Sequence, residues 1–335
     1  MPETMTSQFP TDFLGFDHLI TTRPHDIRQV LISDLHLSHE EPALVQAFLS
    51  LLDNLQVLPD LKALYILGDW FDAWIGDDAY LSLSPQQKRT HWLTPLVDQL
   101  SQLHANGCHI YVMHGNRDFM LGQPFCDSFG GQLIDEPYTL NVGHQRIRLE
   151  HGDALCTDDK AYQRFRRLIR NRWVKKFLLA KSLSKRRQLA EKMRQKSQAS
   201  NARKTQYIMD VNQAAVLNAV KPFDAILHGH THRPALHPIT PIKPAKLSQE
   251  TQDSEVALAV IRQKSRYVLG DWRVKHSNSN KQYVEAVIGI IVVGFTNIAS
   301  GESFINTQLS SESLTPKKPS KSADVTEFLL VKFRA

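Results

Sequence analysis

Gln29-Val-Leu-Ile-Ser-Asp-Leu-His36 joins a short apolar run to an acid and a histidine. On an extended strand, residues two apart share one face, so Asp34 and His36 project together. The same design recurs four times: an apolar, β-rich run stops abruptly at a polar side chain. The later runs are Ala63–Gly68 before Asp69, His109–Gly115 before Asn116, Arg146–Glu150 before His151, and Asp224–Gly229 before His230 and His232.

Segments of helical periodicity, such as residues 42–55 and 93–104, separate several of these runs. Strands that alternate with helices indicate βαβ units, and therefore an α/β fold with largely parallel or mixed sheets. Ligands in such folds bind beyond the carboxyl ends of the strands. All five polar clusters follow strands at that end, which predicts one shared site.

The polar residues after the five runs offer carboxylate, amide and imidazole ligands, and no thiolate. They are Asp34, His36, Asp69, Asn116, His151, His230 and His232. This mixture suits Mn²⁺, Fe²⁺ or Zn²⁺. Seven ligands are too many for one ion but hold two if a carboxylate bridges them, and Asp69 is the natural bridge because it is the single acid of its run. Two ions ~3.5–4 Å apart assist displacement at phosphorus and generate hydroxide at neutral pH.

A basic segment, residues 158–204, interrupts the alternation of strands and helices. Between Lys160 and Lys204 there are 17 Lys or Arg and one acid, a net charge of +16 against +6 for the whole chain. We predict a helical insertion that caps the site and faces phosphates, anionic headgroups or nucleic acid. The alternative is that the segment forms a solvated helix face. Trp173, Phe177 and several leucines are interleaved with its cations, and they suit acyl chains or a membrane interface, or ordinary packing onto the core.

The remaining sequence sets the domain boundaries. We predict a loose leader over residues 1–25, a core formed by residues 26–157 and 205–335, and a Ser/Lys/Pro linker over residues 310–322. The three cysteines show no paired spacing, which fits a reducing compartment. The N-terminus has no secretory signal, and the longest apolar stretch, residues 286–295, is too short to span a bilayer. We expect a soluble protein or one bound only at a membrane surface.

The ordered motifs resemble those of the calcineurin-like metallophosphoesterases, and the longer blocks resemble the UDP-2,3-diacylglucosamine diphosphatases of lipid A biosynthesis. The resemblance covers residues 29–236, with a weaker echo at Val268-Leu-Gly-Asp-Trp272. It implies a sandwich of two mixed sheets flanked by helices, with a small helical cap. The blocks are Ile32-Ser-Asp-Leu-His-Leu37, Tyr65-Ile-Leu-Gly-Asp-Trp-Phe-Asp-Ala-Trp-Ile-Gly-Asp-Asp78, His114-Gly-Asn-Arg-Asp-Phe-Met-Leu121, His151-Gly-Asp-Ala-Leu-Cys-Thr-Asp-Asp159, Ile208-Met-Asp-Val-Asn-Gln213 and His228-Gly-His-Thr-His-Arg-Pro234.

The resemblance also implies roles for individual residues. One metal would be held by Asp34, His36, Asp69 and His232, and the other by Asp69, Asn116, His151 and His230. Mn²⁺ is the usual metal. Catalysis would rest on Asp69, Asn116, Arg117 and His151, and the substrate would contact Asn116, Arg117, Asp159, Ser197, Asn201, Lys204 and His230. The implied reaction is hydrolysis of UDP-2,3-diacylglucosamine at its α-phosphorus by a metal-bound hydroxide, giving UMP and 2,3-diacylglucosamine 1-phosphate, at the cytoplasmic face of the inner membrane.

Arg117 stands where many metallophosphoesterases have a histidine that acts as a general acid. A phosphate leaving group needs charge stabilisation more than a proton, and a guanidinium supplies permanent positive charge. Arg117 therefore favours pyrophosphate over monoester cleavage, unless it is a structural arginine that pairs with Asp118.

Three other functions compete with this interpretation. A nuclease or nucleotide pyrophosphatase of the same superfamily would share the metal ligands, and a nuclease would also use a basic face. A scaffold that only binds would be expected to have lost ligands, yet all seven are present. A nucleic-acid-binding module would carry regularly spaced stacking aromatics, which the basic segment lacks, so nucleic acid is not an expected partner.

Overall fold

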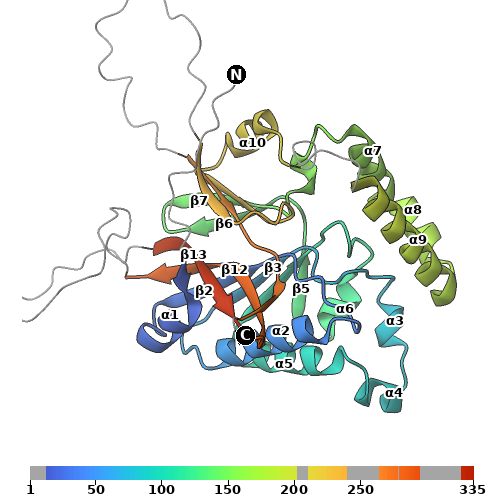
Figure 1. Ribbon diagram of the computed structural model, residues 1–335, viewed down its shortest axis with the longest axis horizontal. Coiled ribbons are helices and arrows are strands. Elements are labelled where there is room, and N and C mark those ends of the chain that lie inside the picture. The colour runs from blue at the N-terminus through green and yellow to red at the C-terminus, as the bar shows by residue number, and fades with distance from the viewer. Residues whose placement is uncertain (1–12, 202–209, 240–263, 278, 295–325) are drawn as a thin grey trace, which may run out of the picture.

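The computed structural model describes residues 13–201, 210–239, 264–277, 279–294 and 326–335. Two β-sheets form its centre (Figure 1). In the larger sheet β11 (Arg273–His276) pairs with β12, and the other strands run in the order β1 (Leu14–Gly15), β13 (Thr326–Arg334), β12 (Gln282–Val293), β2 (Ile27–Ile32), β3 (Ala63–Leu67), β4 (His109–Met113) and β5 (Gly131–Ile134). Strands β2 to β5 are parallel, and β12 runs antiparallel to β2.

The smaller sheet is also mixed. Its strands run in the order β6 (Tyr138–Val142), β7 (Gln145–Leu149), β8 (Ala225–His228), β10 (Lys264–Val268) and β9 (Ala235–Ile239). Strands β7, β8 and β10 are parallel to one another, while β6 and β9 are antiparallel edges. The predicted α/β class with mixed sheets is confirmed.

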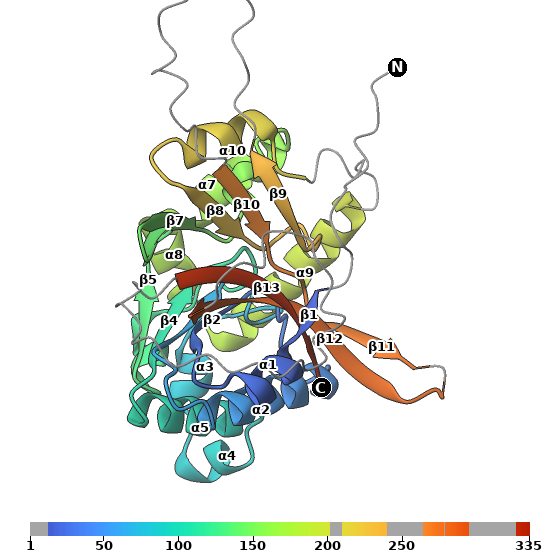
Figure 2. The same cartoon turned by 90° about the vertical axis from the view of Figure 1, so that its left-hand side faces the viewer.

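Helices cover the outer faces of both sheets, giving four layers (Figures 1 and 2). Below the larger sheet lie α1 (Phe16–Thr22), α2 (Pro42–Gln56) and α5 (Thr94–Ala105), with the short α3 (Asp78–Leu81), α4 (Pro85–Arg89) and α6 (Gln123–Asp127) nearby. Above the smaller sheet lies α10 (Gln213–Val220). A 3₁₀ turn, η1 (Asp153–Leu155), precedes the cap helices α7 (Lys160–Ile169), α8 (Arg172–Leu179) and α9 (Leu183–Asn201).

Strand β3 shows why the sheets stack. All five of its residues are buried, and the alternation of side chains sends them to two different cores. Leu64 and Ile66 join the core between the larger sheet and helices α2 and α5, whereas Tyr65 and Leu67 join the core between the two sheets. A strand buried on both faces has no room for polar residues until it ends, so Asp69 marks the edge of the apolar sandwich.

The described residues confirm most of the predicted elements and correct one. The segment predicted as a loose leader contains β1 and α1, and Phe16 and Leu19 of α1 are buried. Phe16 packs edge-on against Phe333 of β13, at 6.2 Å between ring centroids. The leader prediction is therefore wrong for residues 14–22. The predicted linker at 310–322 lies outside the described residues.

Candidate metal and phosphate site

Five of the seven predicted ligands have left-handed backbone conformations. Among the described non-glycine residues only one other, Asn280, has a positive φ. Such conformations cost about 1–3 kcal/mol each and persist at functional sites where the surrounding structure enforces them. Each follows a strand end and turns its side chain back toward the others. The five are Asp34 (φ 55°), His36 (50°), Asp69 (49°), His230 (65°) and His232 (56°).

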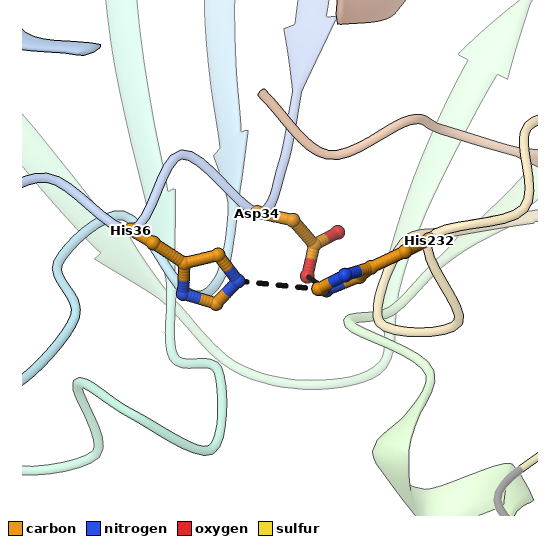
Figure 3. A group of neighbouring side chains, drawn as sticks. All are labelled: Asp34, His36 and His232. Carbon is orange, nitrogen blue, oxygen red and sulfur yellow. Dashed lines mark hydrogen bonds and ion pairs between the residues drawn. The ribbon is translucent and has the colours of Figure 1, made fainter. Parts of the chain in front are cut away.

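Asp34, His36 and His232 form one group of ligand atoms (Figure 3). His232 Nε2 lies 3.5 Å from both Asp34 Oδ1 and His36 Nε2. These separations exceed a normal N–H···O hydrogen bond, and they bring two ring nitrogens and a carboxylate oxygen around one point. The sequence places His232 almost 200 residues from Asp34, so only the stacking of the two sheets brings them together.

Asp69 and His151 belong to a second group, which also includes Asp34. His151 Nε2 lies 3.7 Å from Asp69 Oδ1 and 3.1 Å from the side-chain oxygen of Asn116. His151 Nδ1 is 3.1 Å from the carbonyl oxygen of Leu67, so an N–H at Nδ1 leaves the lone pair on Nε2 directed at the site. Asp69 Oδ2 lies 3.9 Å from His36 Nδ1. Asp69 therefore lies between the two groups of ligands, as expected of a bridging carboxylate.

The donor set fits divalent cations. Asp34 Oδ1 and His36 Nδ1 are buried and make no hydrogen bond within the described residues. Burial lowers the pKa of His36 to about 3 and that of His230 to about 4, so both imidazoles are neutral near pH 7 and keep a lone pair. Burial also raises the pKa of Asp69 above its usual range, and a cation beside it would favour the ionised form. Burial also acts to lower the pKa of His151 and His232, but the carboxylates beside these two rings raise it, to about 9 and about 10. A bound cation would therefore replace the second proton of each ring, and metal ligands of this kind are buried carboxylates and deprotonated imidazoles.

Two glycines let the strand ends approach one another. A Cβ on Gly115 would stand 2.1 Å from Asp69 Oδ1, and one on Gly229 would stand 2.1 Å from Asp34 Oδ2. Side chains at either position would displace the carboxylates. The motif residues Gly115 and Gly229 are therefore part of the site because they leave space for its acids.

His230 lies on the side of the site that faces the cap. Its ring is 5.0 Å from that of His151, and the ring of Tyr162 on α7 stacks over it at 6.3 Å. The Tyr162 hydroxyl donates to Asp153 at 2.5 Å. The sequence interpretation did not single out Tyr162, because a tyrosine within a basic helix carries no motif.

A cavity of about 440 Å³ opens beside the site, between the core and the cap helices. Asn116, Arg117 and Tyr162 line the end nearest the metal ligands. Most of the remaining lining is apolar: Ala73, Trp74, Ile75, Phe119, Met120, Ala161, Phe165, Leu178, Leu189, Ala190 and Met193. Asp72, Arg186, Arg194, Lys196 and Ser197 add the polar part. The cavity therefore joins a polar, charged end beside the metal ligands to an apolar chamber.

Ion pairs hold the cap against the core. Arg166 donates to Asp153 at 2.9 Å and to Glu136 at 2.6 Å, and Arg170 donates to Glu136 at 2.8 Å. Arg186 is only 5 % exposed and donates to the Ile75 carbonyl at 2.6 Å. A solvated helix face, the alternative interpretation of the basic segment, does not describe these arginines.

The predicted substrate contacts divide into three sets. Asn116, Arg117 and Ser197 line the cavity, and His230 adjoins it through Tyr162. Asp159 accepts from the Tyr162 amide at 3.0 Å as the N-cap of α7, and the cavity lining does not include it. The Asn201 side chain and the whole of Lys204 lie outside the described residues.

Arg117 does not pair with Asp118. The Asp118 carboxylate accepts from the Gly115 and Trp70 amides, at 2.7 and 2.8 Å, and so shapes the loop that carries Asn116. The Arg117 guanidinium lies 3.4 Å from Asp72. Asp72 also pairs with Arg194 at 2.9 Å, which brings a second guanidinium to the cavity. The sequence interpretation did not identify Arg194 as a separate residue of the site.

The chain is similar to proteins of known families. Residues 27–234 match the model of the calcineurin-like phosphoesterases. A UDP-2,3-diacylglucosamine hydrolase of Proteus mirabilis is 42 % identical over 212 residues, covering 63 % of this chain and 84 % of the relative. The UDP-2,3-diacylglucosamine hydrolase of Pseudomonas entomophila is 41 % identical, and the match covers 72 % of this chain and 90 % of the relative. The hydrolase of that name from Haemophilus influenzae strain Rd is 38 % identical, and the match covers 78 % of this chain and 97 % of the relative.

Proposed function

Because the chain belongs to the calcineurin-like phosphoesterase family, we propose that it hydrolyses the pyrophosphate of UDP-2,3-diacylglucosamine. Water attacks the α-phosphorus, the bond from that phosphorus to the bridging oxygen breaks, and the products are UMP and 2,3-diacylglucosamine 1-phosphate. The relatives that carry this name match this chain over most of their own length, 84 %, 90 % and 97 % respectively.

The observation that carries the proposal is the cavity. It joins the loop of Asn116 and Arg117, where a diphosphate would bind, to a chamber lined by Trp74, Phe119 and other apolar side chains. A nucleotide or nucleic acid offers only its planar bases to such a chamber, and no long apolar group. Acyl chains do, because each buried CH₂ contributes about 0.8 kcal/mol.

The cofactor in this proposal is a pair of Mn²⁺ ions, with Fe²⁺ or Zn²⁺ as alternatives that the same ligands accept. Asp34, His36, Asp69 and His232 would hold one ion, and Asp69, Asn116, His151 and His230 the other. When bound, such ions act as Lewis acids toward phosphoryl oxygens and lower the pKa of a bound water. The chain's own residues would orient the substrate: Arg117 and Arg194 line the cavity, and their guanidinium groups would stabilise charge on the departing phosphate.

UMP release by the full-length chain tests the proposal. With UDP-2,3-diacylglucosamine in detergent, we expect Mn²⁺-dependent release of UMP, loss of that release after chelation, and its return on re-addition of Mn²⁺. UDP-glucose at the same concentration is the matched control, because it keeps the pyrophosphate and lacks the acyl chains. Equal turnover of both substrates, or cleavage of DNA instead, would refute the proposed substrate.

We also propose that the enzyme binds, as a peripheral protein, the anionic cytoplasmic face of the inner membrane through α7 and α8. Large apolar side chains are exposed there: Leu168 by 58 %, Trp173 by 66 % and Phe177 by 65 %. The exposed cations of these helices include Arg164, Arg167, Arg172 and Lys176. Basic helices with exposed aromatics attach to anionic interfaces.

The three free, buried cysteines are compatible with a reducing compartment. No helix within the described ranges is long and apolar enough to cross a bilayer.

Vesicle sedimentation measures this attachment. Replacing both Trp173 and Phe177 with serine should lower binding to phosphatidylglycerol vesicles at least tenfold, because burial of each side chain contributes about 1.5–3 kcal/mol. The matched control is Val57→Ser, which removes an apolar side chain that is 73 % exposed at the end of α2. The proposal is refuted if the double variant binds phosphatidylglycerol vesicles as well as the native chain does. It is also refuted if the native chain binds neutral phosphatidylcholine vesicles as well as anionic ones.

A further inference from the structure

A carboxylate lies behind His232, on the side away from the other ligands. Asp271 Oδ2 is 3.2 Å from His232 Nδ1, whereas His232 Nε2 faces Asp34 and His36 (Figure 3). A neutral imidazole carries one proton. If Nδ1–H donates to Asp271, the lone pair is on Nε2 and points at the metal ligands. Asp271 is thus placed to select the tautomer that a metal requires.

An arginine holds this carboxylate in place. Arg273 Nε lies 2.8 Å from each carboxylate oxygen of Asp271, and its Nη2 donates to the main-chain carbonyl of His232 at 3.1 Å. One guanidinium therefore fixes Asp271 and the backbone of the histidine that Asp271 contacts. Asp271 is 14 % exposed, so water screens the contact only in part.

The main chain around Asp271 is tied to both sheets. Strand β10 is parallel to β8, so Asp271 follows a strand at the same edge as His230 and His232. The Leu269 amide donates to the His228 carbonyl at 2.8 Å, and the Trp272 amide donates to the Asp34 carbonyl at 3.2 Å. Trp272 is 4 % exposed. These hydrogen bonds tie the main chain on both sides of Asp271 to the strand ends that carry Asp34, His230 and His232.

We propose that Asp271 is a positioning residue of the metal centre: it accepts a hydrogen bond from the Nδ1–H of His232 and so orients Nε2 toward the ion, and Arg273 holds it in place. The proposal rests on the proposed function only in taking His232 as a metal ligand. Carboxylates behind ligand histidines fix the ring and raise its donor strength, and their loss typically costs 10–100-fold in metal affinity or activity.

Mn²⁺ titration of the full chain, followed by the electron paramagnetic resonance signal of free Mn²⁺, tests this role without substrate. We expect Asp271→Ala to raise the Kd of one of two bound ions about 10- to 100-fold, and Asp271→Asn to raise it about tenfold. The matched control is Asp60→Ala, because Asp60 also contacts a histidine nitrogen, His25 Nδ1, at 3.0 Å, on the exposed surface. That variant should bind Mn²⁺ like the native chain.

A double-mutant cycle separates positioning from general loss of structure. In a His232→Ala background, adding Asp271→Ala should change the Kd by less than about twofold, because Asp271 acts only through the histidine. A second large loss, or native Kd values in Asp271→Ala, would overturn the proposal. Should Asp271→Ala not fold, as judged by circular dichroism, the Asp271→Asn titration decides: a tenfold loss supports the role and a native Kd refutes it. A native chain that binds two Mn²⁺ but releases no UMP would refute the proposed reaction alone.

Discussion

Replacing Asp69 with asparagine is expected to reduce UMP release at least about 10³-fold, the largest effect of any single change at this site. Asp69 lies between the two ligand groups, with one oxygen 3.7 Å from His151 and the other 3.9 Å from His36. Metal ions contribute several kcal/mol of transition-state stabilisation, and each 1.36 kcal/mol is tenfold in rate. A neutral amide in this position cannot hold both ions.

Thermal melting supplies a second measurement on Asp69→Asn that does not depend on activity. Native protein should gain stability as Mn²⁺ is added, because a ligand that binds only the folded state stabilises it. Asp69→Asn should lose most of that gain. After chelation its melting temperature should not lie below that of native protein treated in the same way, because the variant removes a buried carboxylate close to Asp34 and Asp118. Native turnover together with a native Mn²⁺ effect on melting would show that Asp69 does not bridge.

The strand ends could be predicted from the sequence because each is a local pattern. An apolar run that stops at Asp, Asn or His spans only about eight residues, so it can be identified without knowing the rest of the fold. If the strands are parallel, all of these ends lie at one edge of the sheet. In the structure β2, β3, β4, β7 and β8 each end beside the same site, where their polar side chains meet: Asp34, Asp69, Asn116, His151 and His230. The order of strands within the two sheets did not follow from these patterns, since it depends on pairings between distant segments.

The features that the sequence did not predict all depend on contacts across long separations. Phe16 is buried because β13, more than 300 residues later, supplies Phe333 to pack against it. Asp271 follows β10, whose neighbour in the sheet, β8, is separated from it along the chain by β9 and by residues 240–263, which lie outside the described residues. The echo at Val268-Leu-Gly-Asp-Trp272 was the available indication, because it repeats the design of a strand that ends in an acid.

The cavity was predictable only in its parts. The sequence predicts a helical cap with interleaved apolar residues over the basic segment, but periodicity does not say which neighbour each face of a helix contacts. In the structure Leu178 and Met193 pack toward the core and line the cavity, while Trp173 and Phe177 remain exposed. Part of the apolar stripe therefore packs onto the core, while another part is exposed and available for the membrane contact that we propose.

Replacing Arg117 with alanine is expected to lower kcat about 10²-fold, the usual cost of removing one group that stabilises transition-state charge. Metal binding should stay native, because the contact from residue 117 to the metal bridge is made by the main chain: the Arg117 amide donates to Asp69 Oδ1 at 2.8 Å. Arg117→Lys keeps the charge but not the planar fork, so we expect an intermediate rate. Mn²⁺ titration and UMP release on the same preparations separate the two effects.

The control for Arg117 is its partner. Asp72 lies 3.4 Å from the Arg117 guanidinium and 2.9 Å from that of Arg194. If Arg117 served only to anchor this loop, Asp72→Asn would cost as much as Arg117→Ala. If the guanidinium instead stabilises the leaving phosphate, Asp72→Asn leaves both cations in the cavity and should cost less than tenfold. Equal losses of kcat in Asp72→Asn and Arg117→Ala would rule out leaving-group stabilisation. So would an Arg117→Ala protein that no longer binds two Mn²⁺. In either case the arginine would act by maintaining the structure of the site and not through its charge.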